Sequence, residues 1–435
     1  MKIKFYYMIL IIIIFLYSRT FYLFYFNDSK ILGQDKYFIL DKKYEYSNYP
    51  IITFEFEKKI YNLLKILEDR FKPEINNCKS IFRLKLIDNE NYEYSKEATE
   101  KIFLYTFKKV KLNEEYNHEK IIKETMQNSN KVKYFIFEDK IVVCCSHLFF
   151  DGSAMFNLTS KMFDYPEEVK QKNFIYIPIY NEIKLIQTIP LTFKYLNKKS
   201  NLSYDYSWKK YKKTKSFIKF NINIKLLKKL KNKINNNLLK NDKISFPIIL
   251  ASLQTMIIFN STKKDKLNIG ITVAFSNKCR FNNFSALPVI INRPKNWNNI
   301  NIKNFMILFY EIIFKLNEKV NKFKNILSLI YSITNIYNFK FGLNKNIDVL
   351  ISSIPMCTKN KLSINNVNLK NTIGFLHGHT MPIYIMNLSQ LGHVNSMIHI
   401  RTDDVDINKI KYFTDNINKW LNSKIDIKNF ASHFK

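Results

Sequence analysis

One histidine in this chain follows a run of residues that is typical of a buried strand. Residues 141–146 (Ile-Val-Val-Cys-Cys-Ser) are mostly apolar, and His147 comes directly after them. Asp151 and Gly152 stand four and five residues further on, and a helical pattern follows. A neutral imidazole at a strand end can take a proton from a hydroxyl or an amine while that atom attacks a carbonyl. The His-x-x-x-Asp-Gly string therefore predicts acid–base chemistry, with Gly152 permitting a tight turn at positive φ.

A surface turn with an incidental histidine is the alternative interpretation of this string. The chain has seven histidines and seven glycines among its 435 residues. At that composition the string arises by chance only about once in a hundred such chains. We therefore expect it to mark a site.

The same string is the signature of the acyltransferases that resemble chloramphenicol acetyltransferase. Further along the chain, Val349-Leu-Ile-Ser-Ser-Ile-Pro355 and the tail from Pro382 to Leu421 resemble one branch of that superfamily, the wax ester synthase/diacylglycerol acyltransferases. A helical pattern at 245–259, a strand pattern at 267–275 and Arg280 follow one another in the order of that branch.

The resemblance covers residues 45–425 and implies an α/β fold of two related subdomains with a tunnel between them. Each subdomain would be a mixed sheet covered by helices. It implies an N-terminal subdomain at 45–200, which carries the string, and a C-terminal subdomain at 214–425. The implied reaction is transfer of a fatty acyl group from acyl-CoA to a long-chain alcohol or diacylglycerol. Acyl-CoA is then a co-substrate, and no cofactor is bound permanently.

The roles of the motif residues carry over from the family to this chain. His147 would be the general base. Asp151 would point away from the substrate and pair with an arginine from the second half, which fixes the local backbone together with Gly152. Arg280 is the expected partner of Asp151, and Arg293 is the competing one. Loss of one partner of such a buried pair costs about 3–5 kcal/mol.

The oxyanion of the reaction needs a hydrogen-bond donor, which contributes about 3 kcal/mol. The resemblance offers Ser352, Ser353 or a backbone N–H near Ser389 as contacts to the oxyanion or substrate. Loop hydroxyls that cap the backbone are an equally good interpretation of these serines. The string His377-Gly-His379 supplies two potential metal ligands without a third, so no metal site is predicted.

The sequence departs from the family pattern in three places. Ser146 stands where the family usually has a second histidine, Phe246-Pro247 replaces an Asn-Asp pair, and the loop after Ser353 reads Ile-Pro-Met-Cys. The general base is kept, but the choice of acceptor is left open. Two alternatives therefore stand: a condensation-type transfer to an amine, and an inactive membrane-anchored module of the same fold that binds lipid or serves as a scaffold.

An apolar segment opens the chain. Residues 5–26 are interrupted only by Ser18-Arg19-Thr20, and their length is enough to cross a bilayer. No small-residue cleavage site follows, which disfavours a signal peptide. We predict a single-pass anchor within residues 1–27, in an endoplasmic-reticulum-like membrane if the chain is eukaryotic or viral, with its orientation open. An interfacial segment with Arg19 at the headgroups is the alternative.

Basic residues outnumber acidic ones by 69 to 36, which gives a formal net charge of +33. This excess fits an anionic membrane surface or the phosphates of coenzyme A, although a biased base composition would also produce a chain rich in Lys, Asn and Ile. No zinc-finger, helix-turn-helix or RNP-like string accompanies the charge, so nucleic acid is not an expected partner. Five cysteines without a Cys-x-x-Cys pair predict reduced thiols.

Hydrophobic periodicity predicts the elements that would position the site. The predicted strands cover residues 51–56, 82–86, 102–107, 132–137, 141–146, 218–224, 267–275, 287–291, 348–353, 383–388 and 395–400. The predicted helices cover residues 60–71, 118–126, 153–162, 226–239, 245–259, 302–324, 327–338 and 408–421. Residues 165–213 are interpreted as an irregular crossover between the halves. The helix at 226–239 is basic, which fits either a solvated face over a core or a membrane surface.

Overall fold

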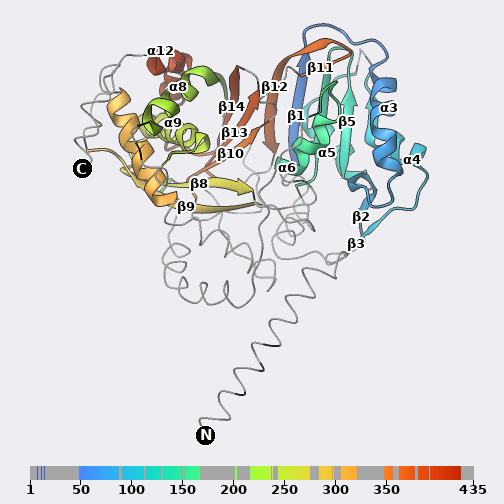
Figure 1. Ribbon diagram of the computed structural model, residues 1–435, viewed down its shortest axis with the longest axis horizontal. Coiled ribbons are helices and arrows are strands. Elements are labelled where there is room, and N and C mark those ends of the chain that lie inside the picture. The colour runs from blue at the N-terminus through green and yellow to red at the C-terminus, as the bar shows by residue number, and fades with distance from the viewer. Residues whose placement is uncertain are drawn as a thin grey trace.

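The computed structural model of the chain describes its two halves. The described residues are 7, 11, 14, 49–87, 91–111, 114–128, 131–147, 150, 152–166, 201–202, 216–236, 238, 243–274, 284–295, 297, 305–320, 347–355, 362–377, 381–390 and 392–422. Within them the chain forms two six-stranded mixed sheets that lie side by side, each with helices packed on it (Figure 1). The crossover at 167–200 and 203–215 and the predicted helix at 327–338 lie outside the described residues.

The first sheet has the strand order β11-β12-β1-β6-β5-β4. Its neighbouring strands are antiparallel except for β4 and β5, which run parallel. The strands are β1 (Tyr49–Phe56), β4 (Phe107–Lys109), β5 (Val132–Ile136), β6 (Lys140–Cys145), β11 (Ser363–Ile364) and β12 (Val367–His377). The predicted strands at 132–137 and 141–146 are confirmed as the antiparallel pair of β5 and β6, and Cys144 and Cys145 are buried in β6.

Helices cover both faces of the first sheet. On one face, α3 (Leu63–Asn76), α4 (Thr99–Thr106) and α6 (Gly152–Ser160) pack over the apolar side chains of β1 and β6 in one core. On the other face, α5 (His118–Met126) packs over Cys144 and Phe135 in a second, smaller core. This arrangement confirms the predicted helices at 60–71, 118–126 and 153–162, with the first of them beginning three residues later than predicted.

The second sheet has the order β7-β14-β13-β10-β8-β9, with β10 parallel to both β8 and β13. Its strands are β7 (Ser216–Asn223), β8 (Lys266–Ala274), β9 (Phe284–Asn292), β10 (Val349–Pro355), β13 (Ile383–Gln390) and β14 (His393–Ile400). A third core joins the sheet to its helices. These are α8 (Ile224–Asn235), α9 (Phe246–Ser261), a helix at 305–320, α11 (Ile407–Asp415) and α12 (Ile417–Leu421).

Cap chemistry and hydrophobicity explain two of these helices. Asp406 accepts hydrogen bonds from the N–H groups of Asn408 and Lys409, so it caps α11. Ser245 occupies the N-cap position of α9, but its side chain makes no capping hydrogen bond. Pro247 is tolerated because it lies in the first turn, where its missing N–H has no helical partner. α9 is apolar almost all round and is buried, and it corresponds to the predicted helix at 245–259.

The predicted strand at 102–107 is wrong. Residues Thr99–Thr106 form α4, and only the three-residue strand β4 follows. Ile102, Phe103 and Thr106 are buried while Leu104 is exposed, a spacing that fits a helix with one buried face. A short apolar run cannot by itself distinguish a strand from a helix.

The predicted strand at 82–86 is correct only for its last three residues. Residues Ile81–Arg83 form a 3₁₀ turn, and the strand is β2 (Leu84–Leu86), which pairs with β3 (Tyr92–Tyr94). Arg83 is buried, and its guanidinium donates to the carbonyls of Ile75, Ser95 and Glu97. These bonds satisfy the buried charge and fix the end of α3.

Strands β11 and β12 connect the two halves. They come from the C-terminal half of the sequence, yet β12 pairs with β1 in the first sheet along almost its whole length. β12 also packs closely on β13 of the second sheet: a Cβ at Gly374 would lie 2.7 Å from the sulfur of Met386. The sequence did not predict either strand. The range 214–425 therefore contributes to both sheets.

Asp164 fixes the hairpin of β11 and β12 to the first half. Its carboxylate accepts hydrogen bonds from Arg70 on α3 (2.6 Å), from the Ser363 hydroxyl (2.7 Å), and from the N–H groups of Asn365 and Asn366. Partial burial alone would raise the pKa of Asp164. These hydrogen bonds outweigh burial and hold the pKa below its ordinary value.

Replacing Asp164 with asparagine should therefore destabilise the protein in a pH-dependent way. We expect a loss of about 2 kcal/mol at pH 7, since the charge-assisted bonds are weakened. A carboxyl with a depressed folded-state pKa stabilises fully above its unfolded pKa of about 4, and the contribution is lost as the pH falls through the folded-state value. Urea unfolding at pH 7 and near pH 3 measures this. A difference between wild type and variant that stays constant with pH would contradict it.

Most of the N-terminal apolar segment lies outside the described residues. Tyr7, Ile11 and Ile14 are described, and each is helical and exposed. Among the helices formed by described residues, none combines the length and the hydrophobicity that crossing a bilayer requires.

Candidate functional site

His147 stands at the end of β6, where the pairing of the first sheet stops. The N–H of Ser146 still donates to the carbonyl of Lys131, 2.8 Å away, so the backbone is held to β5 up to the residue before the histidine. Val143 and Cys145 are buried in the same core as α6, and alternation along the strand places His147 on that face as well. The side chain of His147 is half-buried, with Nδ1 inside. The structure thus gives the predicted base a rigid support.

Gly152 begins α6 and lies against the second sheet. A Cβ at this position would be 3.0 Å from Cγ1 of Ile354 on β10 and 3.2 Å from its Cδ1. The predicted positive φ at Gly152 is wrong, because among the described glycines only Gly392 has one. Glycine is needed here for close approach between the halves and not for a left-handed turn.

This contact can be measured by a double-mutant cycle. Ile354→Ala alone removes a buried side chain and should cost about 3 kcal/mol. In a Gly152→Ala background the same change should cost at least about 0.5 kcal/mol less, because the new methyl group occupies part of the space that is vacated. Denaturant unfolding of the four proteins gives the coupling. Strictly additive effects would indicate that Gly152 and Ile354 do not limit each other.

Ser352 lies on the face of β10 that looks toward the first half. Leu350 and Ile354, which flank it at alternate positions, belong to the core that contains α6 and β6. Its side chain hydrogen-bonds to Tyr384 on the neighbouring strand, and burial raises the pKa of that phenol to about 12. Tyr384 was not predicted as a site residue. Tyr384, Met386 and Leu388 occupy every second position of β13, and this spacing is the sequence signal that places Tyr384 on this face.

Ser353 and Ser389 lie on the opposite face, beneath α9. Asn387 donates to the Ser353 hydroxyl (3.1 Å), exchanges hydrogen bonds with Gln254 of α9, and accepts one from Ser396 (2.7 Å). Ser389 follows Asn387 by two residues and is buried. The three predicted serines are therefore separated by the sheet. Of their hydroxyls, that of Ser352 is on the side of His147.

The predicted bridge between Asp151 and Arg280 lies outside the described residues. Arg293, the competing partner, is engaged elsewhere: its guanidinium donates to the carbonyls of Phe259, Thr262 and Lys264 at the end of α9. An ion pair with the exposed Asp265, at 3.8 Å, adds to these contacts. Arg293 thus stabilises a helix C-terminus, where a cation is favourable.

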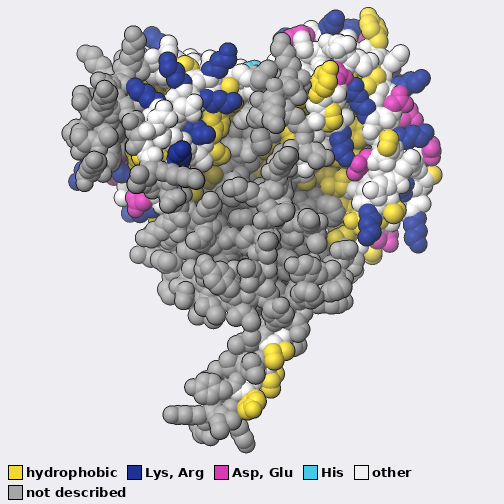
Figure 2. All heavy atoms as spheres, in the orientation of Figure 1, with side chains coloured by type: hydrophobic (Ala, Val, Ile, Leu, Met, Phe, Trp, Pro, Cys, Tyr) yellow, Lys and Arg dark blue, Asp and Glu magenta, His cyan; other side chains and the backbone are white. Residues whose placement is uncertain are grey.

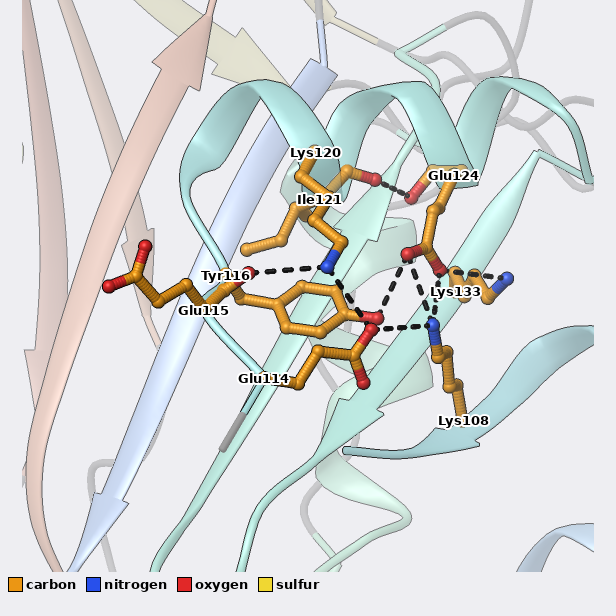
Figure 3. A network of polar contacts seen from close by, with 9 residues as sticks. Lys108, Glu114, Glu115, Tyr116, Lys120, Ile121, Glu124 and Lys133 are labelled. Atoms are coloured by element: carbon orange, nitrogen blue, oxygen red, sulfur yellow. Dashed lines mark hydrogen bonds and ion pairs between the residues drawn. The ribbon is translucent and has the colours of Figure 1, made fainter. Parts of the chain in front are cut away.

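A network of charges holds α5 onto the first sheet, behind the strand that ends at His147 (Figure 3). Glu124 of α5 accepts from Lys108 of β4 (3.1 Å) and from the hydroxyl of Tyr116 (2.9 Å). The ammonium groups of Lys108 and Lys120 lie over the Tyr116 ring, 5.0 and 4.3 Å from its centre. These contacts support the sheet and supply no group to the site. No cluster of three or more metal-ligating side chains occurs among the described residues.

Comparison with known proteins identifies the fold. No protein-family model matches the sequence, and no curated protein matches it at a significant level. The solved structure of TRI3 trichothecene 15-O-acetyltransferase from Fusarium sporotrichioides matches with a TM-score of 0.59 at 10% identity, covering 90% of this chain and 94% of that one. The epimerization domain from the third module of tyrocidine synthetase B matches with 0.54 at 11%, covering 90% and 96%.

A third similar structure contains a derivative of coenzyme A. It is a variant of the starter condensation domain of rhizomide synthetase in complex with C8-CoA, with a TM-score of 0.55 at 9% identity, covering 90% of this chain and 94% of that one. The chain therefore has the two-sheet fold shared by chloramphenicol acetyltransferase-like acyltransferases and condensation domains. This confirms the coarse resemblance that the His-x-x-x-Asp-Gly string predicts.

Proposed function

We propose that the protein is an acyl-CoA-dependent O-acyltransferase that transfers a fatty acyl group to a lipid-like alcohol, with His147 as general base. The observation that carries this proposal is the position of the motif. His147 lies two residues beyond the buried strand β6 of the first sheet, and five residues later Gly152 lies against Ile354 of the second sheet. A proton acceptor at the junction of two halves can meet one substrate from each side.

In the proposed reaction, the imidazole of His147 carries out both proton transfers. His147, neutral, takes the proton of the acceptor hydroxyl as its oxygen attacks the thioester carbonyl. The new C–O bond forms, the carbonyl oxygen becomes an oxyanion, and collapse of that intermediate breaks the C–S bond. The imidazolium then gives its proton to the departing thiolate. The acyl group passes directly from one substrate to the other, so the protein forms no covalent intermediate.

Other residues would position the reactants. Ser352 is the best placed of the predicted serines to donate to the oxyanion, because it lies on the His147 side of β10. Ser353 would act only indirectly, through its hydrogen bond with Asn387 in the polar network beneath α9, and Ser389 lies on the same face as Ser353. Asp151 and Arg280 would form the bridge that holds the motif to the second half. A tunnel between the sheets would admit acyl-CoA from one side and the alcohol from the other.

A choice of a lipid-like acceptor is supported by two features of the sequence. The resemblance to wax ester synthase/diacylglycerol acyltransferases at 349–355 and 382–421 favours a long-chain alcohol or diacylglycerol. The apolar segment at 5–26, as a single-pass anchor, would keep the protein at the membrane where such acceptors are dissolved. A scaffolding or lipid-binding module without catalysis is the competing proposal.

A product assay tests the function. The purified protein is incubated with radiolabelled long-chain acyl-CoA and, separately, a long-chain alcohol, diacylglycerol, an amine and an amino acid thioester. We expect label in the neutral-lipid fraction with one of the first two acceptors and release of free coenzyme A in equal amount. Label in an amide would favour condensation-type transfer, the activity of several domains with this fold. Label in none of them would favour the non-catalytic module.

A further inference from the structure

A surface of lysines lies on the second half, away from the predicted catalytic residues. In α8, Leu227, Leu230 and Ile234 are buried in the core, and the opposite side of the helix carries positive charge. The α8 lysine surface consists of Lys219 on β7 and Lys225, Lys228, Lys229, Lys231 and Lys233 on α8. Apart from the half-buried Lys231, each of these residues is exposed. Figure 2 shows Lys and Arg side chains gathered on this half with few acidic ones among them.

The sequence around this surface lacks acidic residues altogether. Acidic residues make up 36 of 435 positions, about one in 12, yet residues 206–241 contain none. The same 36 positions contain twelve lysines. A biased base composition would enrich lysine throughout the chain, but it would not remove every carboxylate from one stretch of this length. The stretch therefore concentrates about a third of the net charge of +33 in one region.

Several lysines of the first half form ion pairs with acidic side chains. Lys108 lies 3.1 Å from Glu124, Lys120 lies 3.1 Å from Glu114, and Lys133 lies 3.6 Å from Glu124 (Figure 3). On the α8 lysine surface, Lys225, Lys228 and Lys229 form no ion pair within the described part of the chain. Within those described residues their charge is therefore not compensated, and these exposed side chains would attract an anionic partner.

We propose that the α8 lysine surface binds the anionic headgroups of a phospholipid membrane. The exposed side chains of α8 are lysines and an asparagine, and none is an arginine or an aromatic residue. Recognition of nucleic acid commonly uses arginine forks and stacked aromatic rings, which this surface lacks. The apolar side of α8 is already used in the core, so the helix would lie on the headgroups without inserting. Lysine is well suited to such diffuse attraction.

The magnitude of the attraction can be predicted. Each lysine that comes close to an anionic bilayer strengthens partitioning about fivefold. Three lysines should therefore contribute about 100-fold, and the effect should weaken as salt screens the charges. This contribution is independent of acyl transfer, because none of these lysines is placed at the motif.

Vesicle flotation of the full-length protein tests the proposal. Partitioning is measured on vesicles of phosphatidylcholine alone and on vesicles with about 30% phosphatidylserine, and the ratio of the two removes any contribution of the apolar N-terminal segment. The K225Q/K228Q/K229Q variant should lose about 100-fold of the wild-type ratio. A matched control, K58Q/K65Q/K79Q, removes the same charge from exposed lysines of the first half that form no ion pair with another described residue, and it should lose less than about threefold.

Three outcomes would overturn the proposal. Equal losses in the two variants would mean that overall charge, and not the α8 lysine surface, drives binding. No preference of the wild type for anionic vesicles would exclude an anionic membrane as the partner. Loss of retention on single-stranded RNA in the α8 variant, with vesicle binding unchanged, would assign the surface to nucleic acid instead. Acyl transfer to a detergent-dispersed alcohol, measured in parallel, should be the same in both variants and wild type.

Discussion

Replacing His147 with alanine should lower the rate of ester formation about 1,000-fold, because a positioned general base contributes roughly that much to catalysis. The loss should appear in kcat rather than in KM, since the imidazole acts on the transferred proton and not on binding of the acyl chain. The measurement is transfer of labelled acyl groups from acyl-CoA to the preferred alcohol under saturating conditions. His147→Gln should be equally inactive, because an amide cannot accept the proton.

Two controls make this result interpretable. His118→Ala removes an exposed histidine on α5, which packs on Phe375 and lies outside the motif, and should leave the rate within about threefold of wild type. Thermal unfolding of the His147 variants should match wild type closely, since the side chain is only half-buried. Full turnover in a folded His147→Ala protein would remove the basis of the proposed mechanism.

The second large effect is expected at Asp348, just before β10. Its fully buried carboxylate accepts from the backbone N–H groups of Asn201 (2.6 Å), Leu202 (2.9 Å) and Asn268 (2.6 Å) and from the side-chain amide of Asn201 (3.0 Å). Asp348→Ala would remove the acceptor of all four hydrogen bonds at once. We expect the free energy of unfolding to fall by about 3–5 kcal/mol.

Denaturant unfolding monitored by circular dichroism measures this loss. Asp348→Asn should lose less than alanine, because its remaining carbonyl oxygen can still accept from two of the N–H groups. Asp139→Ala, at an exposed turn between β5 and β6, is the matched control and should change stability by less than about 0.5 kcal/mol. An Asp348→Ala protein as stable as this control would show that the buried donors find other partners.

The sequence predicted well those elements whose period is clear over many residues. The alternation of Ile218, Phe220 and Ile222 gave β7, and the apolar spacing of Leu63, Leu67 and Phe71 gave α3. Periodicity gave the wrong element at 102–107, because an apolar run of six residues is too short to distinguish a helix from a strand. It also failed at β12, because the pairing of that strand with β1 joins residues more than 300 positions apart. No local pattern carries such information.

The candidate site was predicted in kind but not in arrangement. The spacing of His147 and Gly152 predicts acid–base chemistry, whereas the reason for the glycine became clear only from Ile354 on another sheet. The sequence alone predicts that the neighbouring serines Ser352 and Ser353 point to opposite faces of a strand. Which of the two faces His147 depends on how the sheets pack, and that is a property of the tertiary structure.

The origin of β12 has a consequence for how the protein is made. A ribosome must translate past residue 377 before β1 gains its neighbour on that side. Until then the nascent first half has an unprotected strand edge that other chains can pair with, which is a common route to aggregation. The protein would therefore depend on chaperones that shield β1 during synthesis, and a fragment that ends before β11 would be expected to precipitate when it is expressed alone.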